Sequence, residues 1–294
     1  MSVTSSSFKR ATKKQARLRL AIVGPAGSGK TFTALTIAAA LSDDVAAIDT
    51  ERGSMSLYSN EFVFDVKELD SFEPSKYRAG IKEAEADGFG AIIIDSLTHA
   101  WAGTGGLLEM KDNAASRQKT KNDYTAWRDV TPEHNALVDS MLQSKIHVIA
   151  TMRSKTEYVM ETQNGKTVPR KVGMAPVQRD GMDFEFGLVF EMDIDNVMVV
   201  SKSRCRTEPL LAMGSVVKEP GAEVAAAIKR WVSEGESEMT RDQENRIDVL
   251  LSERIVPPAH ETSMLARVAA GMTEAKADDA IAWLSALPVK DGVA

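Results

Sequence analysis

The chain has 294 residues, of which 43% are hydrophobic, and a net charge of -6 at pH 7. This length suits one large domain or a domain with a small module, and the charge excludes a polycation, although a local basic stripe would still suffice for nucleic acid. One cysteine, Cys205, excludes an internal disulfide, and the absence of a long apolar run or an apolar N-terminal stretch leads us to expect a cytoplasmic protein without a membrane partner.

The first predicted elements surround a glycine-rich pattern. Residues 1–16 are rich in serine and lysine, and we expect a mobile basic tail. An apolar run at 18–23 predicts a strand, and an alanine-rich run at 31–41 predicts a helix. Between them lies G-x-x-x-x-G-K-T, formed by Gly24, Pro25, Ala26, Gly27, Ser28, Gly29, Lys30 and Thr31. A strand, this pattern and a helix in that order are the context of a phosphate-binding P-loop.

The chemistry of this loop predicts a ligand class. Glycine permits positive φ, so backbone N–H groups can approach phosphate oxygens at the start of the helix. Lys30 is expected to contact the β- and γ-phosphates, and the Thr31 hydroxyl to bind Mg²⁺. The alternative, a chance match in a glycine-rich loop, is disfavoured by the flanking strand and helix. The pattern therefore predicts a nucleoside triphosphate with Mg²⁺.

Strands and helices are predicted to alternate along the next part of the chain. Further strands are expected at 45–48, 62–66, 91–94 and 146–151, and further helices at 76–86, 106–113 and 132–143. Thr131 and Pro132 suit the cap and first position of the last of these helices. This alternation predicts an α/β fold with a mainly parallel central sheet and helices on both faces.

Two acids follow predicted strands. Asp95 ends the apolar run at 91–94, as a Walker B acid does, and is expected to orient the Mg²⁺ shell. Glu51 follows the strand at 45–48, whose carboxyl end lies at the same edge of a parallel sheet as the P-loop. A carboxylate there can orient the water that attacks the γ-phosphate, so Glu51 is the candidate catalytic residue. For Asp95 the alternative is an ordinary acid at a strand exit. For Glu51 it is a helix cap or a solvated acid.

The second half of the chain is less regular. Residues 153–181 show no clear period and are predicted to be a long loop. Runs at 184–192 and 197–201 predict an antiparallel hairpin on the sheet edge, and a helix is expected at 222–232. We therefore expect a core at 17–234, a linker at 235–239 and a small helical module at 240–294. Its helices are predicted at 241–252, 261–270 and 276–287.

Several segments resemble a known family. AAIDTERG at 46–53 and AIIIDSLTHAW at 91–101 resemble the RecA/RadA recombinase core. Residues 18 to about 231 resemble phage-encoded ATP-binding proteins with that core, which are grouped with Sak-type single-strand annealing proteins and often labelled AAA family ATPases. The segments at 130–159 and 171–186 look particularly close to that group. The resemblance implies a RecA-like P-loop NTPase fold, ATP as the nucleotide, and the cytoplasm of a bacterial host if the protein is phage-encoded.

The resemblance also implies site residues and partners. Glu51 corresponds to the family's catalytic glutamate and Asp95 to its Walker B acid. Lys202 and Arg204 resemble basic residues that reach a neighbouring subunit's ATP, which implies a homo-oligomer, either a filament or a ring. Their alternative is a solvated basic strand end. The family's phosphate-sensing Asn-Gln is replaced here by Thr151, Met152 and Arg153, so the resemblance does not extend to coupling through that glutamine.

Basic residues with interleaved aromatics suit single-stranded DNA, because cations meet phosphates and rings stack on bases. By position two segments resemble the DNA-binding loops of the RecA core. Their candidate contacts are Arg153, Lys155, Lys166, Arg170, Lys171, Arg179, Lys119 and Lys121. The alternative is a set of solvated loops.

The predicted function is an ATPase, expected to be stimulated by DNA, that binds single-stranded DNA and promotes annealing or recombination of phage DNA. A single-stranded-DNA-binding protein is a further expected partner. One alternative is a nucleotide-gated DNA-binding protein with secondary hydrolysis. Another is a different P-loop machine, such as a helicase loader, a packaging factor or a nucleotide kinase.

Overall fold

The computed structural model of the protein describes residues 17–117, 123–163, 166–233, 239–269, 272 and 274–290. The chain divides into two compact units. One spans Arg17–Trp231, and the other includes Val232–Ala294.

A sheet with strand order β3-β2-β4-β5-β1-β7-β8-β9 forms the centre of the first unit, and β6 pairs with β5 outside this order. The neighbours from β3 to β7 run parallel, whereas β8 and β9 are antiparallel additions. This architecture confirms the predicted α/β fold with a mainly parallel sheet. The strands are β1 (Arg19–Gly24), β2 (Val45–Asp49), β3 (Asp65–Glu68), β4 (Ala91–Asp95), β5 (His147–Gln163), β6 (Lys166–Pro176), β7 (Leu188–Met192), β8 (Val197–Ser203) and β9 (Val216–Lys218).

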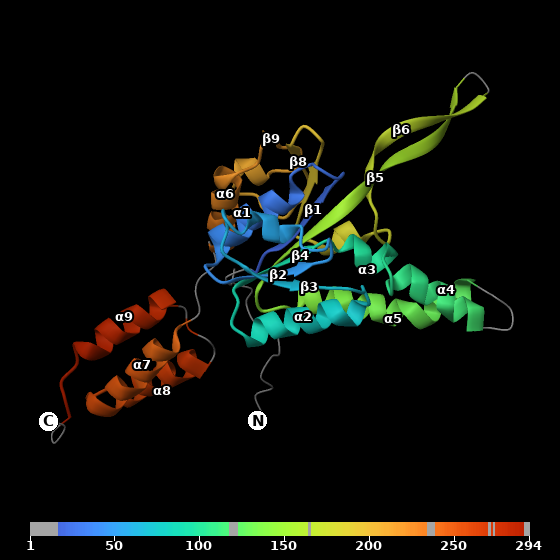
Figure 1. The fold of residues 1–294 in the computed structure, drawn as a ribbon. Coiled ribbons are helices and arrows are strands. Elements are labelled where there is room, and N and C mark those ends of the chain that lie inside the picture. The colour runs from blue at the N-terminus through green and yellow to red at the C-terminus, as the bar shows by residue number, and fades with distance from the viewer. Residues whose placement is uncertain are drawn as a thin grey trace. The chain divides into compact units, whose positions relative to one another are not determined.

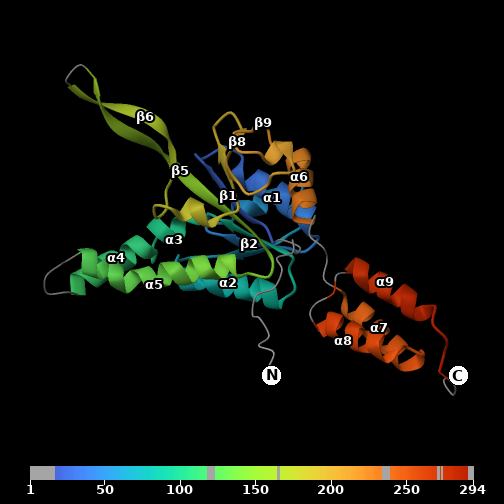
Figure 2. The ribbon, with the colours of Figure 1, turned by 180° about the vertical axis from the view of Figure 1, so that it is seen from behind.

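Helices cover both faces of this sheet. In Figures 1 and 2, α1 and α6 lie on one face, and α2 and α5 lie on the other. Alternate strand residues such as Ile48 and Ile92 are buried against Tyr77 and Leu137 on the α2 and α5 side. The helices of this unit are α1 (Lys30–Leu41), α2 (Pro74–Ala86), α3 (Thr98–Ala102), α4 (Leu107–Arg117), α5 (Asp123–Leu142) and α6 (Ala222–Ser233).

The predicted loop at 153–181 is wrong. Strand β5 continues to Gln163 and pairs antiparallel with β6, with Ser154 opposite Pro176 and Gln163 opposite Lys166. The first part of β5 lies between β4 and β1, and the rest forms a long two-stranded hairpin that projects from the sheet (Figures 1 and 2). The sequence of this segment lacks the alternation of apolar and polar residues on which a strand prediction depends, so it predicts no strand there.

The predicted start of a helix at Pro132 is also wrong. Helix α5 begins at Asp123 and contains Pro132 in its interior. Proline at position 132 removes the usual helical hydrogen bond to the carbonyl group of Arg128, and both residues are exposed. Packing against α2 and α4, including an Arg78–Glu133 ion pair of 2.8 Å, holds the helix across this position.

Two smaller differences concern strands. β3 begins at Asp65, three residues after the predicted start, and all four of its residues are exposed. β7 and β8 form the predicted hairpin, but β9 follows β8 as the last strand in the order.

The second unit contains three helices in its described part: α7 (Arg241–Glu253), α8 (Pro258–Ala269) and α9 (Glu274–Ser285). Thr240 and Gln243 form a capping box at the start of α7. Ile247, Leu250 and Leu284 are fully buried in its small core. These helices lie within a few residues of the predicted ranges, because their apolar residues recur at helical spacing.

Candidate nucleotide-binding site

The glycine-rich loop joins β1 to α1 in a conformation that depends on its glycines. Gly27 has φ 79° and Gly29 has φ 81°, both in the left-handed region. A Cβ atom at Gly24 would lie 2.5 Å from the carbonyl oxygen of Met192, so a side chain there would clash with β7. The loop therefore places its backbone N–H groups around the N-terminus of α1, where they favour an anion.

Lys30 lies against the inner side of this loop. Its ammonium donates to the Pro25 carbonyl at 2.7 Å, and the Lys30 residue is only 9% exposed. Burial lowers the pKa of Lys30, while the nearby carboxylates of Asp95 and Glu51 oppose that shift. This position allows the Lys30 ammonium to bind the phosphate groups of a nucleotide.

Asp95 lies at the end of β4, beside the start of α1. The Thr31 hydroxyl donates to Asp95 Oδ2 at 2.6 Å, and the Thr151 hydroxyl donates to Oδ1. Burial removes water from the Asp95 carboxylate, and this loss of solvation raises its pKa. A cation bound beside the carboxylate would stabilise its charged form. The described residues contain no group of three His, Cys, Asp or Glu side chains that could hold a metal ion. Thr31 and Asp95 fit Mg²⁺ in the P-loop manner, in which substrate phosphates and water complete the shell.

The turn after β2 carries Glu51 toward the same region. Asp49 pairs with Asp95 across the β2–β4 register, and its buried carboxylate accepts the N–H groups of Glu51 at 2.6 Å and Met55 at 3.1 Å. These two bonds fix the backbone of the turn. Glu51 is close enough to Asp95 and Lys30 to affect the pKa of each.

Glu51 forms an ion pair with Arg153. Both Nε and Nη2 of Arg153 donate to Glu51 Oε1, at 3.1 and 2.9 Å. The sequence predicts Arg153 as a DNA contact and places it where the related family has its phosphate-sensing Asn-Gln, whereas the structure places it against Glu51. The two residues are 102 positions apart, so no local sequence pattern predicts the contact.

His99 is a further neighbour of the site. Its Nδ1 lies 2.6 Å from the Thr50 hydroxyl, which also accepts the N–H of Ser96 at 2.7 Å. The ring stacks on Phe72 with 4.9 Å between centroids, and burial followed by the charge of Arg153 lowers the pKa of His99. The imidazole thus links the turns that follow β2 and β4. Its position four residues after Asp95 is the only sequence signal for this role.

A cavity of about 620 Å³ opens beside the P-loop. Phe32 and Tyr58 line it as an edge-to-face pair with centroids 6.1 Å apart, and Asn196 and Glu219 supply polar atoms. Apolar rings with a few hydrogen-bonding groups suit a nucleotide base and ribose. The sequence reasoning missed these four residues, because they come from separate parts of the chain.

Other predicted residues lie elsewhere. Lys202 donates to the carbonyl groups of Asp183 and Phe184, and its ammonium lies 5.7 Å from the centroid of the Phe184 ring. Arg204, just after β8, is exposed and donates its backbone N–H to Gly187. The described contacts bring neither side chain to the P-loop, and their action on a neighbour's ATP stays a prediction.

Some of the predicted DNA contacts lie in the β5–β6 hairpin and others lie elsewhere. Lys155 is exposed on β5, and the Arg179 guanidinium lies 5.8 Å from the centroid of the Trp127 ring. The backbones of Lys166, Arg170 and Lys171 belong to β6. Lys119 and Lys121 lie outside the described residues.

Comparison with known proteins agrees with this geometry. The sequence model of a protein family described as an AAA domain matches residues 16–210, most of the chain, and no curated protein matches. The match agrees with a P-loop ATPase core that binds and hydrolyses nucleotide. In the described part of the chain, no helix has the length and apolarity to cross a membrane.

Proposed function

The chain belongs to the AAA domain family, and from that premise we propose that it hydrolyses ATP in order to act on single-stranded DNA during annealing or recombination. The observation that carries this proposal is the course of β5. Thr151 and Arg153 contact the two acids of the nucleotide site, and the next residue, Ser154, begins the long hairpin with β6. One strand thus connects the nucleotide site to a projecting ribbon that bears Lys155, Lys166, Arg170 and Lys171.

Each residue of the site has a separate role in ATP hydrolysis. Glu51 accepts a proton from water as the water oxygen bonds to the γ-phosphorus, and the bond from that phosphorus to the β–γ bridging oxygen breaks to leave ADP and phosphate. Lys30 and the backbone N–H groups of the P-loop neutralise the charge that develops on the phosphate oxygens. Bound Mg²⁺, held by Thr31 and Asp95, supplies further charge neutralisation.

The hairpin suits a nucleic-acid strand by its shape and its residues. A positively charged ribbon can follow a phosphate backbone without reading base sequence. The resemblance to phage annealing proteins favours single strands over duplex, and it also favours assembly with further copies of this chain.

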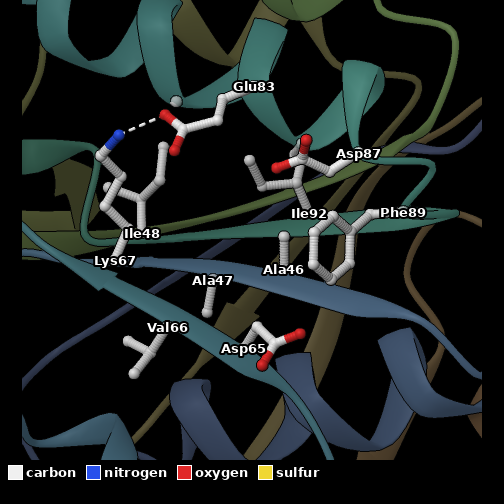
Figure 3. Close-up of a pocket in the computed structure, with 12 residues that line it drawn as sticks. Ala46, Ala47, Ile48, Asp65, Val66, Lys67, Glu83, Asp87, Phe89 and Ile92 are labelled. Atoms are coloured by element: carbon white, nitrogen blue, oxygen red, sulfur yellow. Dashed lines mark hydrogen bonds and ion pairs between the residues drawn. The ribbon is translucent and has the colours of Figure 1, made fainter.

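An exposed sheet edge supports assembly. The residues of β3 are exposed at the end of the strand order, and a hollow of about 290 Å³ lies beside them. Figure 3 shows that Ile48, Phe89 and Ile92 line this hollow and that the Lys67–Glu83 ion pair lies at its side. An open strand with a hollow of mixed apolar and charged lining next to it can accept an extended segment from a second copy.

The direct test measures ATP hydrolysis with and without a single-stranded oligonucleotide, with Lys30→Ala as the inactive control. We expect stimulation by the oligonucleotide, together with an affinity whose logarithm falls linearly with the logarithm of salt concentration. Hydrolysis that is indifferent to the oligonucleotide would refute the DNA assignment and favour another P-loop machine.

The Glu51–Arg153 ion pair favours a second candidate function. An acid engaged by a guanidinium suits slow turnover, as expected of a nucleotide-gated DNA-binding protein in which hydrolysis is secondary. In that case Glu51→Gln would anneal complementary strands as well as the unaltered protein does, whereas loss of annealing in this variant supports the first candidate.

A further inference from the structure

Arg153 engages the candidate catalytic acid through a single carboxylate oxygen. Its Nε and Nη2 both donate to the same oxygen, Oε1 of Glu51, rather than one to each carboxylate oxygen. A carboxylate oxygen that accepts two bonds from a cation has its lone pairs occupied and its charge neutralised. In this arrangement Oε1 of Glu51 is occupied and is a poorer site for the proton of an attacking water.

The backbone of Arg153 belongs to both the sheet and the hairpin. Arg153 pairs with Gly24 in the β1–β5 register, and its N–H donates to the Thr98 hydroxyl at 2.9 Å. Its carbonyl oxygen accepts the N–H of Val177, just beyond the end of β6, at 2.7 Å. A shift of the hairpin therefore acts on the residue that holds Glu51.

The ion pair is accessible enough to be exchanged. The side chains of Arg153 and Glu51 are 47% and 29% exposed. Exposed ion pairs are weak and are screened by salt, so another anion can compete for the guanidinium. A phosphate group is a strong competitor, because the planar guanidinium fork binds phosphate oxygens in a bidentate manner.

Other charged groups lie close to the Glu51–Arg153 ion pair. The cation of Lys30 and the imidazole of His99 lie within electrostatic range of Glu51 and Arg153, and Asp95 lies within range of Glu51. When Arg153 leaves, Glu51 remains positioned by the bond from its own N–H to Asp49. Release of the side chain thus frees the acid without disturbing the turn that carries it.

We propose that Arg153 is a positioning residue that restrains Glu51, and that nucleic-acid phosphates bound at the β5–β6 hairpin draw Arg153 away and so release the acid. This inference rests on the proposed function. It gives DNA stimulation a physical route, from the hairpin through one side chain to the water-activating carboxylate.

The test compares steady-state ATP hydrolysis by Arg153→Ala and the unaltered protein, with and without a poly-dT oligonucleotide. Loss of the restraint should raise the DNA-free kcat by about two- to fivefold, the range expected for an exposed pair, with little change in KM for ATP. The ratio of rates with and without oligonucleotide should fall toward one. Arg153→Lys, which keeps the charge but lacks the fork, should lie between the two.

Two variants serve as controls. Arg230→Ala breaks a different Arg–carboxylate pair, in which Nε and Nη2 donate to separate oxygens of Glu208 at 2.9 and 2.7 Å, and should leave the DNA-free rate unchanged. The double variant Arg153→Ala with Glu51→Gln should show no rise, since the gain depends on the freed carboxylate. Thermal unfolding of each variant establishes that the change in rate does not follow from a change in folding.

The outcomes separate this inference from the proposed function. A DNA-free kcat that falls or stays unchanged in Arg153→Ala overturns the restraint, even if DNA stimulates the unaltered protein. A rise in Arg153→Ala without any stimulation of the unaltered protein supports the restraint but overturns both release by DNA and the proposed function.

Discussion

The buried carboxylate of Asp95 offers a prediction in which stability and function change in opposite directions. Asp95 is 3% exposed, and its two oxygens accept the hydroxyl groups of Thr31 and Thr151. Both partners are neutral, and burial raises the pKa of Asp95 above its ordinary value of 3.8. Holding the negative charge in the nucleotide-free protein therefore costs free energy, and Asp95→Asn removes that charge without changing the shape of the side chain.

The sign of the effect follows from proton linkage. Because the pKa of Asp95 is higher in the folded protein, the native state binds more protons, and the contribution of this group to stability declines as pH rises from about 4. The amide of the Asp95→Asn variant cannot ionise, so the advantage of the variant over the unaltered protein grows over the same range. Each threonine hydroxyl can donate or accept, so both hydrogen bonds are kept. We expect a gain of about 1 kcal/mol or more at neutral pH, or about 2–4 °C in Tm.

The assay is thermal unfolding, followed by circular dichroism at pH 5 and pH 8 with and without Mg²⁺ and a non-hydrolysable ATP analogue. A ligand at 100 times its Kd stabilises by about 2.7 kcal/mol, and this stabilisation should be present in the unaltered protein but lost in Asp95→Asn. Asp248→Asn, which removes an exposed charge from α7, is the matched control. An Asp95→Asn protein that is less stable alone and still gains full stability from Mg²⁺ and the analogue would refute the reasoning.

Three other substitutions test separate parts of the structure. Gly29→Ala should lower the free energy of unfolding by about 1 kcal/mol and weaken nucleotide binding, because φ is 81° at this position and the new Cβ would lie 3.0 Å from Asn196 Oδ1. Nucleotide binding that is unchanged by calorimetry would contradict this prediction. His147 Nδ1 accepts the N–H of Leu18 at 2.9 Å, and burial lowers the pKa of His147 to about 4. The free energy of unfolding should therefore fall by about 2–3 kcal/mol at most as the pH is lowered from 6.5 to 4. Urea titrations should show a smaller fall for His147→Asn, and an equal fall in the variant would contradict this role of His147. Leu250→Ala should destabilise the α7–α9 unit by about 2–5 kcal/mol while ATP hydrolysis is retained. If the circular-dichroism signal of the helices and the ATPase activity were lost together on heating, the two units would not be independent.

The nucleotide site could largely be predicted from the sequence, because its chemistry depends on local patterns. The loop from Gly24 to Thr31 needs glycine where φ is positive, and these positions recur at a fixed spacing. Asp95 follows a continuous apolar run, which a strand buried on both faces requires. The parallel order then brings the ends of β2 and β4 to the same edge as the P-loop.

The remaining features depend on contacts between distant segments. The Glu51–Arg153 pair follows from the strand order β2-β4-β5, in which Ile48 pairs with Ile94 and Ile94 pairs with Ala150, and no local pattern encodes that register. Pro132 has the chemistry of a helix start, but packing of α5 against its neighbours overrides that preference. The cavity beside the P-loop takes Tyr58, Asn196 and Glu219 from segments that meet only in the folded chain.

The role of Glu51 is the central claim, and its most direct test compares Glu51→Gln with the unaltered protein. Glutamine keeps the shape of the side chain and still accepts a hydrogen bond, but it does not take up a proton from water. With the exposed Glu61→Gln as control, the account predicts Mg²⁺–ATP binding close to that of the unaltered protein and a kcat for hydrolysis lowered by about 10²–10⁴-fold. A Glu51→Gln protein that binds ATP and hydrolyses it at the unaltered rate would contradict the account.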